Sequence, residues 1–184
     1  MTYELKVAGL TRELPIVAVS EDLAIASFVL LGDCEMAAEA APYLVDRLPK
    51  VDYLVTAEAK GIPLVQEMAR IMGMKTYIVA RKSEKPYMEN TISASLVSIT
   101  TQKRQTLYLD GKDGALLKGK NVAVVDDVIS TGESLRALEE LMKACEANVI
   151  AKAAILAEDK AADRDDIIFL ERLPLFNAKT GEML

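Results

Sequence analysis

The feature that most limits the fold of this chain is a regular alternation of strand-like and helix-like segments between residues 33 and 158. Short apolar runs are separated by longer stretches whose apolar residues recur with helical spacing. The predicted strands lie at 51–58, 75–82, 121–129 and 148–158, and the predicted helices at 33–48, 62–73 and 134–145. This alternation predicts an α/β domain with a mainly parallel sheet flanked by helices.

The remaining segments are less regular. Residues 83–94 show no clear period and are interpreted as a loop, whereas the runs at 95–101 and 105–110 predict a hairpin with Gln102, Lys103 and Arg104 at its tip. A last strand is predicted near 167–173. Asp33 is suited to cap the first helix, and Pro42 inside that helix is able to kink or split it.

The most apolar strand runs directly into two acidic residues, Asp126 and Asp127, within the segment VAVVDDVISTGES at 122–134. Carboxylates are costly to bury without partners, so an acid pair at the end of a buried strand indicates a binding site. In a parallel sheet, ligands bind beyond the carboxyl ends of the strands. Because 58–61, 81–82 and 126–134 all follow strand ends, we expect them to gather on one edge of the sheet.

The loop from Ser130 to Ser134 leads straight into the last of these helices. A helix N-terminus exposes N–H groups and the positive end of the helix dipole, and Gly132 lets the backbone approach a ligand closely. With the hydroxyl groups of Ser130, Thr131 and Ser134, these groups would form a cradle for a phosphate. By itself the loop is explained equally well by hydroxyls that only cap the helix, and the spacing of a P-loop is missing.

The acid pair favours the phosphate site. A ligand with a phosphate at one end and a vicinal diol nearby would satisfy both the loop and the carboxylates, and a ribose 5-phosphate has that shape. Asp126 and Asp127 would accept hydrogen bonds from the ribose hydroxyls. They would also place negative charge where the sugar develops positive charge.

Composition excludes several other kinds of site. The chain has 184 residues and a net charge of −6, which suits one globular domain and excludes general nucleic-acid binding through a basic surface. Histidine is absent, and the cysteines Cys34 and Cys145 show no zinc or redox spacing. The longest nearly apolar stretch, Leu23 to Leu31, is too short to span a bilayer, and the N-terminus has no signal-peptide pattern. We therefore expect a cytoplasmic protein without membrane or nucleic-acid partners.

The segment Val122 to Ser134 resembles, at every position, the phosphoribosyl-pyrophosphate signature of type I phosphoribosyltransferases: an apolar run, an acid pair, two apolar residues, small hydroxyl residues and glycine. The resemblance covers about residues 50–158. Glu58-Ala59-Lys60-Gly61 resembles the family's pyrophosphate loop, and Ala80-Arg81-Lys82-Ser83 resembles the basic strand end before its mobile catalytic loop. Within the family the chain is most similar to the adenine and xanthine enzymes.

The resemblance implies the type I phosphoribosyltransferase fold in a single domain, 1–184. Its core would span about 33–158, with a small hood from about 1–31 and 159–184. The base is expected to pack under this hood. For Leu14-Pro15-Ile16-Val17 and Phe176, both contact with the base and ordinary core packing are open.

The resemblance also implies a role for each matching residue. Asp126 and Asp127 would hold the ribose hydroxyls, with Mg²⁺ close by and bound through water and substrate oxygens. Ser130, Thr131, Gly132, Glu133 and Ser134 would hold the 5-phosphate, chiefly through backbone N–H groups. Ala59, Lys60 and Gly61 would hold the pyrophosphate of phosphoribosyl pyrophosphate, and the Ala59–Lys60 peptide is expected to be cis.

The resemblance assigns a role to some of the cationic residues more clearly than to others. Arg81 would reach the pyrophosphate of a partner subunit in a homodimer, and together with Lys60 and the acid pair it is expected to carry the catalysis. Lys82 and Lys85 are candidate phosphate ligands or ordinary solvated lysines. Lys103 and Arg104 are weaker candidates, because a basic hairpin tip is usually surface.

The implied reaction transfers 5-phosphoribose to a purine base and releases pyrophosphate. The ribosyl centre would pass through an oxocarbenium-like state, and because water competes as nucleophile a closing lid is expected within 83–105. Ser130 stands where hypoxanthine-guanine enzymes carry an aspartate, which favours adenine and the product AMP. Xanthine and orotate stay open as bases. The loop KSEKPYMENTISAS lacks the histidine-containing pattern of orotate enzymes and the Glu-Tyr pair of adenine enzymes.

A second class of function is a regulator that binds phosphoribosyl pyrophosphate without catalysis. Relatives of that kind carry an added N-terminal DNA-binding domain, whereas the residues before position 50 show no helix-turn-helix pattern and no basic surface. A pyrophosphokinase relative would be much longer. These observations favour the enzyme.

Overall fold

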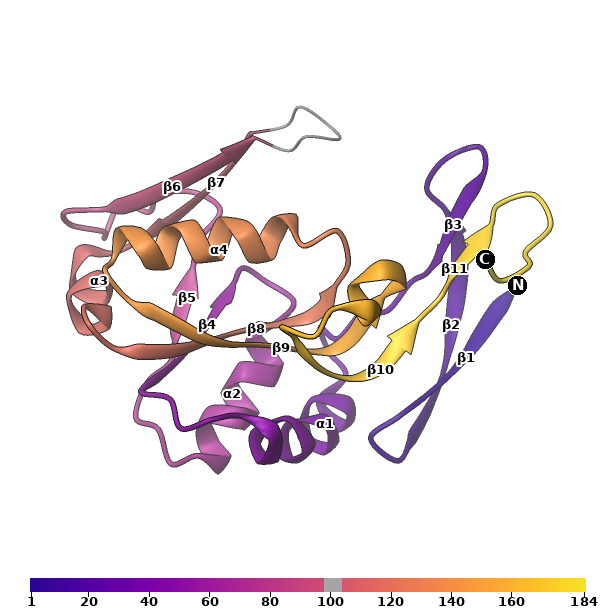
Figure 1. The fold of residues 1–184 in the computed structure, drawn as a ribbon, viewed down its shortest axis with the longest axis horizontal. Coiled ribbons are helices and arrows are strands. Elements are labelled where there is room, and N and C mark those ends of the chain that lie inside the picture. Colours follow the sequence, from indigo (N-terminus) through magenta and orange to yellow (C-terminus); the bar gives the residue numbers. More distant parts are fainter. Residues whose placement is uncertain (98–103) are drawn as a thin grey trace.

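A computed structural model describes residues 1–97 and 104–184. A five-stranded parallel sheet with the order β10-β9-β8-β4-β5 lies at the centre (Figure 1). Its strands are β4 (Tyr53–Ala57), β5 (Ile78–Ala80), β8 (Asn121–Ile129), β9 (Asn148–Glu158) and β10 (Ile168–Leu173). The predicted α/β architecture with a mainly parallel sheet is confirmed.

Helices cover both faces of this sheet (Figure 1). α1 (Cys34–Arg47) and α2 (Ile62–Ile71) pack together on one face, and α4 (Glu133–Ala144) lies on the other. Two short helices, α3 (Gly111–Leu117) and the 3₁₀-helix η1 (Asp159–Asp163), were not predicted. Because both faces are covered, four successive residues of β8 are buried: Val122 and Val124 belong to one apolar cluster, and Ala123 and Val125 to the other.

The first helix begins as the sequence predicts. The Asp33 carboxylate accepts a hydrogen bond from the Met36 amide at 3.0 Å, which satisfies one of the free N–H groups at the start of α1. Arg12 holds the same carboxylate from the N-terminal part of the chain, with its Nε 2.8 Å from Oδ2. α1 continues through Pro42 as one helix, so it is not split there.

The predicted hairpin is present as β6 (Ile92–Val97) and β7 (Arg104–Leu109), which pair antiparallel. It begins three residues earlier than the sequence pattern indicated, and it packs against α4. Arg104 opens β7, whereas Gln102 and Lys103 of the predicted tip lie outside the described residues. Part of the segment proposed as a lid lies outside them as well.

Both ends of the chain meet in a second, antiparallel sheet with the order β1-β2-β3-β11 (Figure 1). Its strands are β1 (Thr2–Val7), β2 (Leu10–Ala18), β3 (Leu23–Ala26) and β11 (Leu175–Asn177). No strand was predicted in these segments. Leu14 and Phe176 are buried in the core, so for these two side chains the structure favours packing over contact with a ligand.

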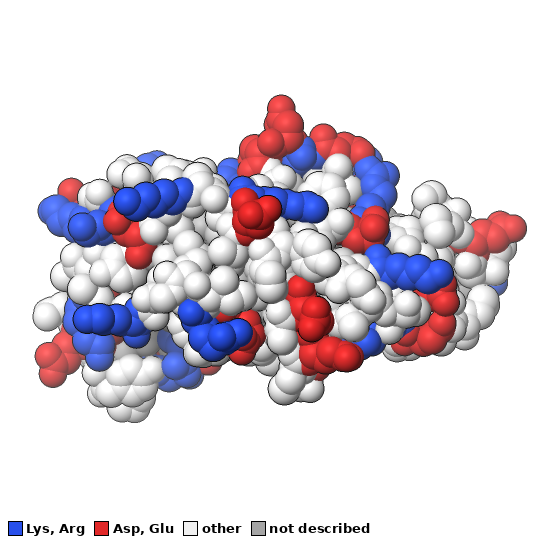
Figure 2. Space-filling view, turned by 90° about the horizontal axis from the view of Figure 1, so that it is seen from below, with Lys and Arg blue, Asp and Glu red and all other residues white. Residues whose placement is uncertain are grey.

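The surface carries mixed charge. Figure 2 shows Lys and Arg side chains interspersed with Asp and Glu over the face that it displays, without an extended basic area. Among residues 1–97 and 104–184, no helix has the length and apolar character that crossing a bilayer requires.

Candidate active site

The central sheet has a topological switch point between β4 and β8. From β4 the chain passes through α2 to β5 on one side, and from β8 it passes through α4 to β9 on the other. The two helices lie on opposite faces of the sheet (Figure 1). The connections therefore diverge beyond the carboxyl ends of these two strands, which is where open α/β sheets form a ligand crevice.

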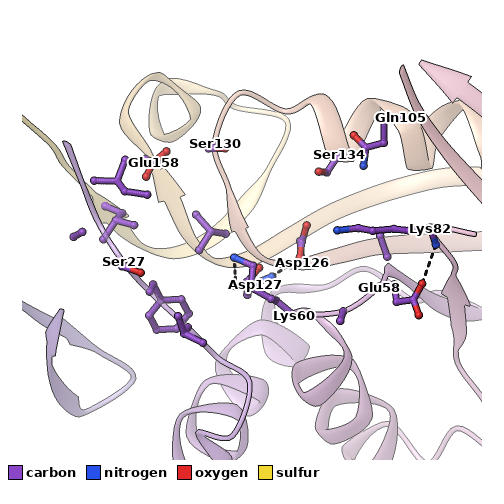
Figure 3. A pocket seen from close by; sticks show the side chains of 18 residues that line it. Ser27, Glu58, Lys60, Lys82, Gln105, Asp126, Asp127, Ser130, Ser134 and Glu158 are labelled. Carbon is purple, nitrogen blue, oxygen red and sulfur yellow. Dashed lines mark hydrogen bonds and ion pairs between the residues drawn. The ribbon is translucent and has the colours of Figure 1, made fainter. Parts of the chain in front are cut away.

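A cavity of about 360 Å³ lies at this switch point (Figure 3). The predicted site residues that line it come from the segments after β4, β5 and β8: Ala59, Lys60, Lys82, Asp126, Asp127, Ser130 and Ser134. An adjoining small pocket is lined by the whole loop from Ser130 to Ser134, together with Asp126. The segments that follow separate strands are thus gathered on one edge of the sheet, as the sequence predicts.

The acid pair lies near the carboxyl end of β8 and lines this cavity. Asp127 is only 2% exposed, and its Oδ2 accepts no hydrogen bond from any described residue. Lys60 Nζ lies 3.1 Å from that Oδ2, which is an ion-pair distance, but the ammonium group is not aligned for a hydrogen bond. Burial, and then the negative charge of Asp127, raise the pKa of Asp126. The pair therefore holds negative charge that lacks full compensation within the described chain.

The loop after β4 packs directly against this pair. A Cβ atom on Gly61 would collide with the buried Thr56 hydroxyl and would lie 3.2 Å from Asp126 Oδ1, so only glycine fits there. Glu58 still belongs to the sheet ladder, because its amide donates to the Ala80 carbonyl at 2.9 Å. The chain leaves the ladder directly after Glu58, and the cis peptide is Glu58–Ala59. The prediction of a cis Ala59–Lys60 bond is therefore wrong by one residue.

The loop after β8 ends in the N-terminus of α4. Gly132 is the N-cap residue with φ 77°, a left-handed conformation that favours glycine, and the Thr131 hydroxyl beside it accepts a long hydrogen bond from the Glu133 amide at 3.5 Å. Ser130 and Ser134 are exposed and line the cavity instead. Capping therefore accounts for the Thr131 hydroxyl but not for Ser130 and Ser134, and a phosphate held by this loop stays a prediction.

Two predicted cationic residues lie outside the cavity. The Arg81 guanidinium donates from Nε to Glu58 Oε1 at 2.9 Å and from Nη1 to the Tyr87 hydroxyl at 3.0 Å. Lys85 Nζ donates to the Ser83 hydroxyl at 2.6 Å. By contrast, Figure 3 shows the Lys82 side chain extending into the cavity.

Several lining residues were not predicted as site residues. They are Ala57, Glu58, Gln105, Val128, Glu158, Leu173 and the segment 25–29. Glu58 and Glu158 follow the same rule as the acid pair, since each is a carboxylate at the end of a strand, and this signal was sufficient to find them. The backbone amide of Lys82, and then the charge of Arg81, lower the pKa of Glu58. For 25–29 the sequence offers only an apolar run.

The fold and the cavity together define an α/β protein with a ligand site at the carboxyl edge of a parallel sheet, lined by an acid pair, two lysines and a helix N-terminus. A family model narrows this class. Residues 39–176 match the model described as the phosphoribosyl transferase domain, and the chain belongs to this family.

Similar proteins carry several functional names. A hypoxanthine/guanine phosphoribosyltransferase of Methanosarcina barkeri is 36% identical over 114 residues, which is 60% of this chain and 55% of that protein. The purine biosynthesis transcriptional repressor of Bacillus subtilis is 29% identical over 133 residues, or 71% of this chain and 45% of the repressor. The chain thus spans about half the length of the curated relatives that it matches.

Solved structures support the fold. The adenine phosphoribosyltransferase of Thermoanaerobacter pseudethanolicus superposes with a TM-score of 0.64 at 24% identity, over 78% of this chain and 84% of that one. The type I phosphoribosyltransferase fold expected from the sequence is therefore confirmed.

Proposed function

We propose that this protein is a purine phosphoribosyltransferase that moves the 5-phosphoribosyl group of phosphoribosyl pyrophosphate to a purine, with adenine favoured and AMP as the product. In this reaction the bond from C1 of the ribose to the pyrophosphate oxygen breaks, and a bond from C1 to a ring nitrogen forms. The base loses the proton of that nitrogen. The observation that carries the proposal is the buried acid pair, which faces a cavity between a lysine loop and a helix N-terminus.

The phosphate end of the substrate fits the loop from Ser130 to Ser134. The first amides of α4 and the positive end of its dipole face that loop, where an anion is stabilised. A helix N-terminus binds a phosphate through N–H groups that are already in place, so little reorganisation is needed. We assign the 5-phosphate to this loop.

The ribose fits the acid pair. Ionised carboxylates accept hydrogen bonds from vicinal hydroxyls, and their charge stabilises an oxocarbenium-like ribosyl centre more than it stabilises the ground state. The buried Asp127 Oδ2, which accepts no hydrogen bond from the described residues, is suited to this role. Lys60 would then be free to move from Asp127 to the departing pyrophosphate.

The same pair fits a magnesium ion only with help from the substrate. Among residues 1–97 and 104–184, no group of three or more acidic or cysteine side chains is placed to hold a metal ion, so the protein by itself offers few ligands. Mg²⁺ commonly keeps water and binds phosphates beside one or two carboxylates, which Asp126 and Asp127 would provide. When bound, the ion would neutralise charge on the pyrophosphate.

The pyrophosphate fits the segment Ala59 to Gly61 and the Lys82 side chain. Lys60 and Lys82 line the same cavity and bring positive charge into a protein with a net charge of −6. Several negative charges leave with pyrophosphate, so local cations lower the energy of the departing group.

Arg81 and the oligomeric state are linked in the proposal. Arg81 lies at the end of β5, the edge strand of the central sheet, and does not reach the cavity of its own chain. We propose a homodimer in which Arg81 serves the partner subunit's site. Light scattering is expected to give twice the mass of the chain, and a monomer at working concentration would contradict this arrangement.

The base is proposed to bind between the acid pair and the terminal sheet, which acts as the hood of a single domain. Ser130 replaces the aspartate of hypoxanthine-guanine enzymes, which favours adenine, and xanthine is the next candidate. The names of the relatives include hypoxanthine/guanine enzymes, so the choice of base needs a direct test.

The test is a spectrophotometric assay of pyrophosphate formation from phosphoribosyl pyrophosphate and Mg²⁺ with adenine, hypoxanthine, guanine, xanthine and orotate. We expect turnover with purines, fastest with adenine, and none with orotate. Absence of turnover with every purine, for a protein whose melting curve shows that it is folded, would refute the proposed activity.

A regulator is the second candidate, because the match to the Bacillus subtilis repressor covers 71% of this chain. A regulator would bind phosphoribosyl pyrophosphate without turning it over. Calorimetric binding of phosphoribosyl pyrophosphate together with no pyrophosphate release in the assay would favour this function over the enzyme.

A further inference from the structure

The cavity has a second end that neither the phosphate loop nor the acid pair occupies. In Figure 3, Ser134 and Lys82 lie on one side of the acid pair, whereas Glu158 and Ser27 lie on the other. The apolar lining of the cavity includes Ile25 and Phe28, which are close to Ser27 in the chain, and Leu173, which pairs with Glu158. A flat aromatic base fits such walls, and the polar groups among them would decide which base is bound.

Glu158 is the acidic group at this end. It is the last residue of β9, where its backbone pairs with Leu173 of β10 and follows the pairing of Ala157 with Ile129 of β8. The pairing with β10 and the pairing of the preceding residue with β8 therefore hold the residue in place. The side chain is half-buried, and burial and neighbouring charges act on its carboxyl, whereas no hydrogen bond from a described residue does.

The charges and the burial around Glu158 are those expected of a carboxylate that lacks a hydrogen-bond donor. Burial, and then the charge of Asp159, raise the pKa of the Glu158 carboxyl, whereas the charge of Lys60 lowers it. A ligand that donates a hydrogen bond to this carboxylate would remove the cost of leaving it half-buried without a partner. A ligand that presents a carbonyl oxygen at the same point would add repulsion between two acceptors.

An ionised carboxylate accepts hydrogen bonds and donates none, so the edge of the base that faces it must carry N–H groups. We propose that Glu158 selects the base, by accepting a hydrogen bond from the exocyclic amino group of an aminopurine. Adenine offers that group next to a ring acceptor. Guanine offers an amino group next to a ring N–H, and the two can meet both carboxylate oxygens. Hypoxanthine has no amino group and offers a carbonyl oxygen or a single ring N–H.

This inference rests on the proposed function for the place of the base, but its test does not require turnover. The readout is the affinity of the protein for AMP, GMP and IMP, measured by titration calorimetry for the wild type and for Glu158→Gln. The glutamine side chain has nearly the same shape, but its amide also donates hydrogen bonds. Glu140→Gln, at an exposed position on α4, is the matched control.

We expect the wild type to bind AMP or GMP about 10- to 100-fold more tightly than IMP, as one hydrogen bond to a charged acceptor implies. Glu158→Gln should remove most of this preference, and IMP should bind as well as before or better. Glu158→Asp keeps the charge but shortens the side chain, and it should retain part of the preference. The control should behave like the wild type, and the comparison of AMP with GMP decides which aminopurine is bound.

Two results would overturn the proposal. The first is a wild type that binds IMP at least as tightly as both AMP and GMP. The second is a Glu158→Gln protein that folds normally and keeps the wild-type preference, or loses affinity for all three nucleotides by the same factor. If the preference is present and depends on Glu158 while no purine is turned over, the proposed activity fails and the assignment of Glu158 stands.

Discussion

Replacement of Asp127 by asparagine separates a functional role of the acid pair from a structural one. Asp127 is 2% exposed, and Lys60 Nζ at 3.1 Å is the cation that the structure places beside it. Asparagine has almost the same shape but carries no charge. The substitution therefore removes the repulsion between the two adjacent carboxylates and the cost of burying a charge, and it gives up the ion pair with Lys60.

The expected change in stability is small and not negative. The Lys60 side chain is half exposed, so the lost ion pair is worth only ~0.2–1 kcal/mol. The raised pKa of Asp126 shows that burial and the charge of Asp127 already disfavour a second charge, and asparagine relieves the latter effect. We expect the free energy of unfolding to stay level or rise by about 1 kcal/mol, which corresponds to about 2–4 °C in Tm.

Activity should fall steeply in the same variant. One charge-assisted hydrogen bond to the ribose is worth ~1.5–3 kcal/mol, which is a loss of about 10- to 150-fold in kcat/KM. Because the missing charge also stabilises the ribosyl transition state, kcat should fall as well as substrate affinity. Asp126→Asn should behave in the same way.

The assay combines thermal melting with steady-state kinetics on phosphoribosyl pyrophosphate and adenine. Asp46→Asn, at an exposed position on α1, is the matched control and should leave both quantities unchanged. A Tm that drops by many degrees in Asp127→Asn while kcat is retained would refute the reasoning, because the acid pair would then hold the fold together rather than the substrate.

Three further predictions use other parts of the structure. Gly132→Ala should lower stability by ~1–2 kcal/mol, because residue 132 has a left-handed φ of 77°. The new Cβ would also lie 3.0 Å from Arg164 Nη1, so the variant should bind inorganic phosphate more weakly in a calorimetric titration. The control Gly73→Ala, at φ 66° with open space around it, should lower stability without weakening phosphate binding. Hydrogen bonds from Arg164, and then from Lys152, lower the pKa of Asp166, so the stabilisation is present above about pH 4 and is lost as the pH falls through the lower folded value. Urea unfolding between about pH 7 and pH 3 should therefore show a smaller loss of stability for Asp166→Asn than for the wild type, and equal slopes would contradict the ion pairs. Asp33→Ala should lower the free energy of unfolding by ~1 kcal/mol or more, because it removes both the cap of α1 and the partner of Arg12. Asp33→Asn should keep part of the cap. Equal melting temperatures for the wild type and both variants would rule this out.

The central part of the fold could be predicted because its signals are local. Apolar runs such as Val122 to Val125 are buried on both faces of the sheet, and such runs indicate a covered parallel strand before any contact is known. Asp33 and Gly73 mark helix ends through their own backbone preferences. The terminal sheet could not be predicted in this way, because β11 pairs with β3 across almost the whole length of the chain.

In the candidate site, too, some features follow from local sequence and others depend on the tertiary structure. Its residues after β4 and β8 follow from the rule that ligands bind at the carboxyl ends of parallel strands, and this rule depends only on the order of the elements. Glu158 was within reach of the same rule, since it ends β9. The same rule could not give the position of the cis peptide, because that position depends on where Glu58 leaves the ladder with β5.

The sequence by itself determined the alternation of strands and helices, the family and the acid pair followed by a phosphate-type loop, because these properties reside in short segments with their own periodicity and chemistry. Only the tertiary structure decided that Lys60 meets Asp127, that Arg81 is held by Glu58 and Tyr87 away from the cavity, and that 25–29 closes the cavity beside Glu158. These contacts join segments far apart in the chain. Their geometry depends on strand order and on how the layers pack, and no local pattern encodes either of these.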